Sequence, residues 1–192
     1  MIRGHYDKML AKIADGTSPV EYSEHLLSYL AASFKAVSWE RFQEELTQRP
    51  WTVCQGDCHP GNVLWPKNAE VAGGVTLIDF EVVTLGSGAQ ELGQFLISHM
   101  APDVRRSCEK QLVTDYYEEL KAALTARGLE EEANNYTFEA CWSEYTAGGA
   151  GRWAFFIPLL TSMCPPVMNE YFRDQYVAFS CSCCDFVVSV TD

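Results

Sequence analysis

Apolar residues recur at helical spacing in the first part of the chain. Between residues 26 and 34 they lie three and four positions apart, which places them on one face of a helix. Ser18, Pro19 and Glu21 precede this stretch in the order of a capping box with a first-turn proline. The pattern predicts a helical N-terminal part over residues 1–50. Its buried face is predicted to comprise Leu26, Leu27, Leu30, Ala31 and Phe34.

The pattern changes to short β-prone runs over residues 51–90. The runs are 52–55, 63–65 and 75–78, and glycine and proline residues separate them. The last run ends in Asp79. Polar residues therefore stand at the ends of a small predicted β segment.

Residues 91–192 return to helical spacing. We expect helices over 91–100, 103–127 and 138–147, and from Met168 onward. Gly128 predicts a helix end, and the glycines at 148, 149 and 151 predict a break. The whole pattern predicts one domain over residues 1–192, of the α+β class, mainly helical, with a small β insertion.

Composition and charge exclude several classes of protein. The chain has 192 residues, of which 47% are apolar, so it can bury a core and is not intrinsically disordered. With 14 basic and 26 acidic residues its net charge is −12. This charge argues against nucleic acid or an anionic membrane as partner, since both require a basic face. It is compatible with a cationic small substrate.

Nothing in the sequence predicts a membrane span or a leader peptide. The most apolar run, from Trp153 to Leu160, is too short and contains Pro158. Residues 1–15 have no apolar stretch of the signal-peptide type. We therefore expect a cytoplasmic protein whose eight cysteines are reduced thiols.

The residues that carry chemistry lie between Gln55 and Asp79. The first segment reads Gln-Gly-Asp-Cys-His-Pro-Gly-Asn, and the second reads Leu-Ile-Asp-Phe-Glu. The oxygens of Asn62 and Asp79 suit Mg²⁺, which takes a few protein oxygens and completes its shell with phosphate and water. Asp57 then remains to face a substrate hydroxyl. Phosphoryl transfer needs this combination of metal and carboxylate.

The two segments resemble the catalytic loop and metal-binding segment of the aminoglycoside phosphotransferase and choline kinase-like superfamily, whose members are relatives of protein kinases. The resemblance covers about residues 53–97. It implies that Asp57 is the catalytic base, that Asn62 and Asp79 bind Mg²⁺, and that ATP is the phosphate donor. It also places His59 where protein kinases carry a lysine, in reach of the transferred phosphate.

Two further residues support the loop in this interpretation. Gln55 occupies the position that usually holds histidine in the superfamily, where the side chain packs the loop. Glu91, followed by Leu92, resembles the acidic residue that braces the loop. Residues before the loop offer no glycine-rich strand pair and no lysine-bearing strand, so the chain is expected to be a C-terminal lobe without the nucleotide-covering lobe.

Two other residue patterns suggest different functions. Asp57 and His59 also match the first motif of metallophosphoesterases, but the later motifs of that family are missing. Cys181 and Cys184 have zinc-knuckle spacing, yet no second pair accompanies them, so buried free thiols and no zinc are expected.

The aromatic and acidic residues of the C-terminal part have two interpretations. Most of them are expected to pack the helices. A few are candidates for a substrate pocket in which an aromatic face and a carboxylate hold a cation. These candidate substrate contacts are Glu81, Trp142, Glu144 and Trp153.

The predicted function is transfer of the ATP γ-phosphate to a hydroxyl group of a small molecule. The sequence does not identify the acceptor, and the candidates are choline, ethanolamine, an aminoglycoside, a sugar and a steroid alcohol. The alternative is a catalytically incomplete lobe that acts as a binding or interaction module. For catalysis, a partner chain or a missing N-terminal lobe is expected to complete the nucleotide site.

Overall fold

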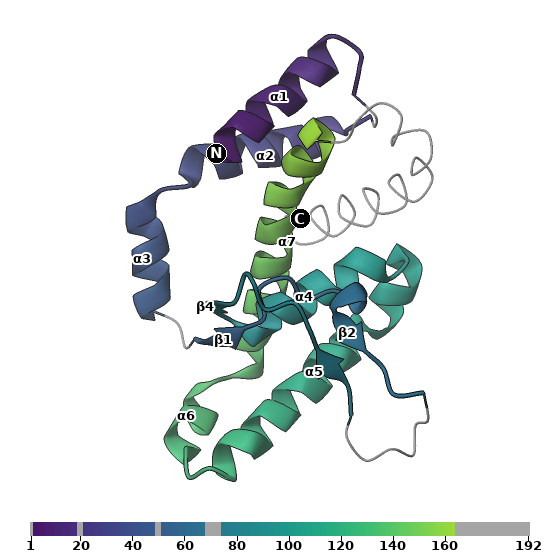
Figure 1. The fold of residues 1–192 in the computed structure, drawn as a ribbon. Helices are drawn as coiled ribbons and strands as arrows, with labels where there is room; N and C mark the ends of the chain where they lie inside the picture. Colours follow the sequence, from purple (N-terminus) through teal and green to yellow (C-terminus); the bar gives the residue numbers. More distant parts are fainter. Residues whose placement is uncertain (1, 19–20, 49–50, 68–73, 164–192) are drawn as a thin grey trace. The chain divides into compact units, whose positions relative to one another are not determined.

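The chain folds into two compact units. The computed structural model describes residues 2–18, 21–48, 51–67 and 74–163 (Figure 1). One unit comprises Met1–Thr47 together with the chain from Ala150 onward, and the other comprises Gln48–Gly149. The mainly helical structure with two small sheets is compatible with the predicted α+β class. Among the described residues, no helix has the length and apolarity that crossing a bilayer requires.

The first unit is helical. It contains α1 (Ile2–Ala14), α2 (Glu24–Ala36), α3 (Trp39–Gln48) and the final turns of α7 (Phe138–Met163). Its core includes Met9 of α1, Leu26, Leu30 and Phe34 of α2, and Ile157 and Thr161 of α7. The Lys12 ammonium donates to the carbonyl of Thr161 at 2.8 Å, and the Tyr22 hydroxyl lies 2.6 Å from the Thr161 hydroxyl. Side-chain hydrogen bonds therefore join α1 and the segment before α2 to α7.

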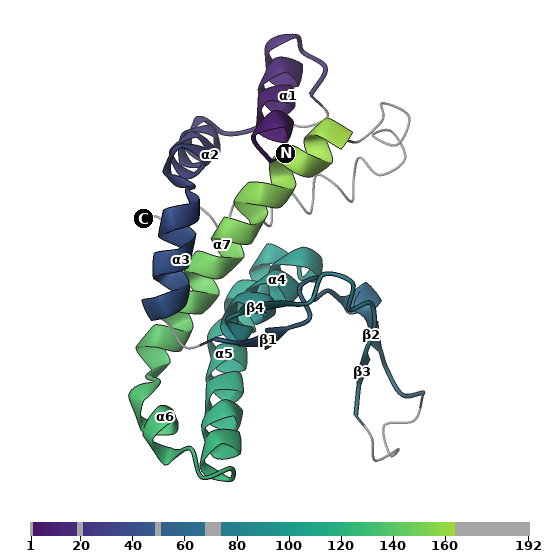
Figure 2. The same cartoon turned by 60° about the vertical axis from the view of Figure 1, so that its left-hand side comes forward.

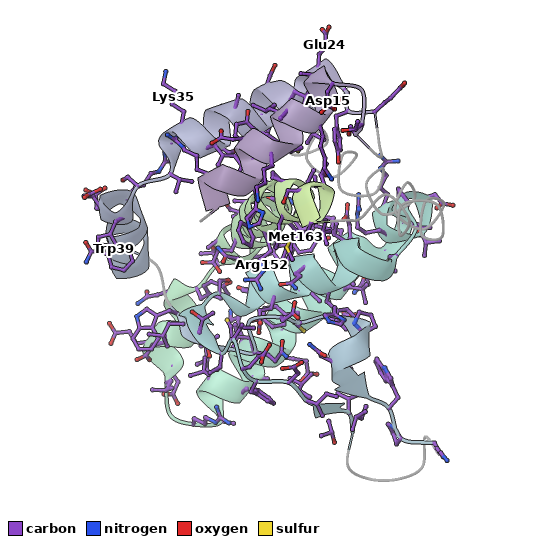
Figure 3. All side chains as sticks on the ribbon, turned by 45° about the horizontal axis from the view of Figure 1, so that its top comes forward. Asp15, Glu24, Lys35, Trp39, Arg152 and Met163 are labelled. Carbon is purple, nitrogen blue, oxygen red and sulfur yellow. The ribbon has the colours of Figure 1, made fainter. Side chains whose placement is uncertain are left out.

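Helix α2 begins later than the sequence predicts. Its N-cap is Ser23, whose Oγ accepts from the Leu26 N–H at 3.2 Å, so the capping box predicted at Ser18 is wrong. The predicted buried face is correct at Leu26, Leu30 and Phe34, whereas Ala31 is exposed. In Figure 3, Glu24 and Lys35 point outward from the two ends of α2. The acidic residue is at the N-terminus and the basic residue is in the last turn, as the helix dipole favours.

Two short antiparallel ladders begin the second unit. β1 (Thr52–Cys54) pairs with β4 (Thr84–Gly86), with Val53 opposite Leu85. β2 (Val63–Leu64) pairs with β3 (Thr76–Leu77), and a 3₁₀ turn, η1 (Pro60–Asn62), leads into β2. The hairpin of β2 and β3 projects away from the helices of its unit (Figure 2). Strands were predicted at β1, β2 and β3, whereas β4 was not.

Four helices complete the described part of this unit. They are α4 (Gly88–His99), α5 (Pro102–Thr125), α6 (Glu130–Asn135) and the first turns of α7. α4 packs against α5 and against β1, and α5 packs against α6. The predicted helices over 91–100 and 103–127 are confirmed, and Gly128 has a φ of 75° just beyond α5. The helix predicted from Met168 lies outside the described residues.

The glycine cluster in α7 does not break the helix, contrary to the sequence prediction. α7 runs without interruption from Phe138 to Met163. A Cβ atom at Gly148 would collide with the side chain of Gln90 on α4. The missing side chain therefore lets α4 and α7 approach closely, which explains this glycine without a turn.

Candidate active site

The loop between β1 and η1 is held to the end of β3 by one buried side chain. The Gln55 amide nitrogen donates to the carbonyl oxygens of Ile78 at 2.9 Å and Asp79 at 2.6 Å. Its amide oxygen accepts from the Asp57 N–H at 2.8 Å. Gln55 therefore joins the two motif segments, and its amide satisfies both donor and acceptor functions, as a buried polar group requires.

Glu91 holds the same loop from the other side. It lies in the first turn of α4, and its two carboxylate oxygens accept from the N–H groups of Gln55 at 3.0 Å and Gly56 at 2.6 Å. Gly56 has a φ of 91°, and a Cβ atom there would collide with the carbonyl of Val82. The loop turns sharply at a residue that must be glycine, and the Glu91 carboxylate fixes the turn.

The Asp57 carboxylate is half-exposed beside His59. Its Oδ2 lies 3.6 Å from Nε2 of His59, and 38% of the Asp57 side chain is accessible. The Gly61 N–H donates to Nδ1 of His59 at 3.1 Å. That hydrogen bond assigns the ring hydrogen to Nε2, the nitrogen nearer to Asp57. The carboxylate is therefore supported by the loop and still open to a ligand.

Hydrogen bonds to main-chain groups connect Asn62 and the segment of Asp79 to the loop that carries Asp57. The Asn62 amide nitrogen donates to the main-chain carbonyl of Asp57 at 3.0 Å, which leaves its Oδ1 as an acceptor. The Ile78 N–H donates to the carbonyl of Asn62 at 3.0 Å. Asp79 follows directly, with a φ of 59° in the left-handed region that aspartate tolerates better than most residues. Hydrogen bonds thus link the three predicted functional positions.

Cys58 lies in the same loop and is poorly suited to act as a nucleophile. Burial raises the pKa of its thiol to about 11, and the carboxylates of Glu91 and Asp57 add to the shift. The thiolate is the reactive form of cysteine. The loop therefore keeps this sulfur protonated at neutral pH.

Alkylation of Cys58 should consequently be slow in the folded chain. Because the thiolate fraction falls about tenfold for each pKa unit above the pH, iodoacetamide should react about 100-fold more slowly than with the unfolded chain. Mass spectrometry of the peptide that contains Cys58 measures this rate. Asp57→Asn removes one of the negative charges and should accelerate the reaction. Equal rates in the folded and unfolded chain would contradict the proposed loop environment.

The candidate substrate contacts differ in how far they are buried. Glu81 is exposed in the turn after Asp79. The Glu144 carboxylate is buried and accepts hydrogen bonds from the Ser87 and Tyr136 hydroxyls. Burial and Glu144 together raise the pKa of Tyr136, so its hydroxyl remains a donor. The side chain of Trp153 lies outside what the structure describes.

Trp142 packs among aromatic rings. Its ring centroid lies 6.3 Å from that of Phe138 and 5.3 Å from that of Tyr145. These contacts agree with the expected packing of the helices. A role for Trp142 or Glu144 in substrate binding stays a prediction.

Four cysteines lie in the part of the chain that the structure describes. Cys54, Cys58, Cys108 and Cys141 are thiols that form no disulfide bond. Cys181 and Cys184 lie outside the described residues. Within the described part of the chain, no three His, Cys, Asp or Glu side chains converge on a metal-sized site.

One contact to the loop was missed by sequence reasoning. The Gln94 amide nitrogen donates to Oδ1 of Asp57 at 3.2 Å. The position lies three residues after Glu91, so both side chains project from the same face of α4. This spacing is the sequence signal that could have identified Gln94.

Comparison with protein families identifies the chain. The ecdysteroid kinase-like family matches residues 6–129, and the chain belongs to that family. The family is part of the protein-kinase-like and choline kinase-like superfamily, which includes small-molecule phosphotransferases. Comparison with curated proteins and with solved structures returned no match.

Proposed function

We propose that the chain transfers the γ-phosphoryl group of ATP to a hydroxyl group of a small molecule. The observation that supports this most is the hydrogen-bonded linkage of Asp57, Asn62 and Asp79. Asn62 bonds to the carbonyl of Asp57, and Gln55 bonds to the backbone of both Asp57 and Asp79. Phosphoryl transfer depends on positioning and electrostatics, which such a rigid set of groups supplies.

The residues present fit a magnesium ion that is shared with phosphate. Asn62 uses its amide nitrogen within the loop and keeps an amide oxygen for a ligand, while the Asp79 side chain is exposed. Mg²⁺ needs only one or two protein carboxylates when phosphate and water complete its shell. Bound by Asn62 and Asp79, it would neutralise charge on the phosphates of ATP.

The chemistry of transfer assigns a separate role to Asp57. The acceptor oxygen forms a bond to the γ-phosphorus while the bond to the ADP oxygen breaks, and the acceptor proton passes to the Asp57 carboxylate. His59 carries its Nε2 hydrogen beside this carboxylate and can donate to a phosphate oxygen in the same space. Gln55 and Glu91 hold the loop on which both residues lie.

We propose a steroid alcohol of the ecdysteroid class as the acceptor. The name of the family supports this choice. The net charge of −12 instead supports cationic acceptors, namely choline, ethanolamine and aminoglycosides. An assay of these compounds with radiolabelled ATP distinguishes the two classes of acceptor. If no compound in the panel became labelled, and the label stayed in ATP and phosphate, the result would argue against the transfer function.

Magnesium and ATP together should stabilise the folded chain. A ligand at ten times its Kd adds about 1.4 kcal/mol to folding when it binds only the native state. That increment corresponds to a rise in melting temperature of about 3–6 °C at this chain length. Thermal unfolding with ATP plus either Mg²⁺ or EDTA measures the effect. An unchanged melting temperature at millimolar Mg²⁺ and ATP would contradict nucleotide binding by this chain.

A non-catalytic binding module is the second candidate function. Apolar side chains remain exposed along the β segment, although soluble monomers rarely expose large apolar patches. They include Val53, Leu64, Trp65, Leu77, Phe80 and Leu85. Val53 and Leu85 are paired across β1 and β4. Three results together would favour this second function. The chain would not bind nucleotide, it would self-associate in sedimentation experiments, and Val53→Lys would make it monomeric.

A further inference from the structure

Helix α4 holds three consecutive residues of the loop through two side chains on one face. Glu91 accepts from the N–H groups of Gln55 and Gly56, and Gln94 donates to the side chain of Asp57. The spacing of three residues puts Glu91 and Gln94 on the same face of the helix. Gln94 is only 4% exposed, so its amide is fixed by its surroundings.

The two carboxylate oxygens of Asp57 have different environments. Oδ1 accepts from Gln94 at 3.2 Å, which is within hydrogen-bond range. Oδ2 lies 3.6 Å from Nε2 of His59, which is too long for a hydrogen bond. The carboxylate is therefore anchored through one oxygen, and the other oxygen is left for a ligand hydroxyl.

We propose that Gln94 is a positioning residue that sets the orientation of the Asp57 carboxylate for proton transfer. The inference rests on the proposed phosphotransferase function and adds a residue to it. The backbone contacts of Gln55 and Asn62 fix the main chain of Asp57, but they leave its side chain free to rotate. An uncharged amide restrains that rotation without neutralising the carboxylate, which a lysine or arginine at this place would do.

A purely structural role for Gln94 makes a different prediction. A buried glutamine that only satisfies packing would lower stability when replaced, and the loss would be the same whatever residue stands at position 57. A positioning role acts through the Asp57 carboxylate, so its effect on turnover must disappear when that carboxylate is absent.

Four variants of the 192-residue chain test the proposal. Gln94→Met keeps the volume and removes the donor, and Gln94→His restores a donor of similar reach. Asp57→Asn and the double variant complete the cycle. Gln90→Met is the matched control, because Gln90 is one turn earlier on α4 and lies against Gly148. Turnover and KM for ATP are measured with the acceptor that labels best, or with water as acceptor.

The expected result is a loss confined to turnover. Gln94→Met should lower kcat about 10- to 100-fold, the effect of one hydrogen bond to a charged group, with KM for ATP unchanged. Gln94→His should recover part of this loss, and Gln90→Met should match the unaltered chain. In the Asp57→Asn background Gln94→Met should cause no further loss. A full further loss in that background, or equal changes in kcat and KM, would overturn the proposal.

A spectroscopic measurement separates this inference from the proposed function. The side-chain amide resonance of Gln94, assigned from its disappearance in Gln94→Met, should shift when Asp57 becomes Asn, because its acceptor loses a charge. Absence of a shift would overturn the positioning role even in an active enzyme. Lack of turnover in the unaltered chain would contradict the proposed function, and the resonance would still show whether Gln94 holds Asp57.

Discussion

Replacing Asp57 with asparagine should lower turnover by about 10²–10⁴-fold, the range typical of a positioned base. The amide has the size and shape of the carboxylate but cannot accept the proton of an acceptor hydroxyl. The loop should persist, because Gln55 and Asn62 bond to the N–H and carbonyl of Asp57, which the substitution leaves in place, and the asparagine oxygen can still accept from Gln94. Steady-state kinetics with radiolabelled ATP measures the effect.

A measurement of stability makes that result specific. The free energy of unfolding of Asp57→Asn, from urea titration, should stay close to that of the unaltered chain, because the side chain is half-exposed. Full activity in Asp57→Asn would remove the proposed mechanism, since no base would then be required at this position.

Replacing Glu91 with alanine should destabilise the second unit. The substitution leaves the N–H groups of Gln55 and Gly56 without their carboxylate acceptor, and both residues are buried. Hydrogen bonds to charged groups contribute about 1.5–3 kcal/mol each, so loss of the two should lower the free energy of unfolding by about 3–6 kcal/mol. Turnover should fall as well, because the loop that carries Asp57 loses its support.

Glu119→Ala is the matched control for this prediction. Glu119 is an exposed glutamate on α5, and surface substitutions of this kind change stability by about 0.5 kcal/mol or less. Urea unfolding of both variants provides the comparison. The bracing role of Glu91 fails if the two variants unfold at the same urea concentration.

Local patterns in the sequence were sufficient to predict much of the fold. Leu26, Leu30 and Phe34 are buried at the spacing that predicted their helix, because helical periodicity is a local property. The short strands β1, β2 and β3 were also found, since turn residues bound them. Gly128 marked the end of α5 correctly.

The errors came from interactions between distant residues. β4 is only three residues long and is defined by pairing with β1 some thirty positions away, which no local pattern reveals. Gly148 was interpreted as a break, whereas it permits contact with Gln90 on another helix. The capping box at Ser18 was a better match in sequence than Ser23, but α2 begins at Glu24, and Ser23 is its N-cap.

In the candidate site, too, local features were predicted from the sequence and contacts between distant residues were not. The motif residues were identified from their order, and the resemblance implied a bracing role for Glu91, a position from which its carboxylate bonds to the loop. The two hydrogen bonds from the Gln55 amide nitrogen to Ile78 and Asp79, and the contact of Gln94 with Asp57, depend on how β3 and α4 meet the loop. Sequence order alone does not define these distances. The roles of Asp57, Asn62 and Asp79 stay predictions.

The most direct test of the account compares Asp57→Asn with Asp79→Asn in one kinetic assay and one titration of ATP in the presence of Mg²⁺. Asparagine also tolerates the left-handed backbone of position 79, so both variants should fold. We predict that Asp57→Asn retains nucleotide affinity and loses turnover, because it keeps the metal ligands. Asp79→Asn should first lose affinity, because it removes a charge from the metal site. Equal loss of nucleotide affinity in the two variants would contradict the assignment of base and metal ligand.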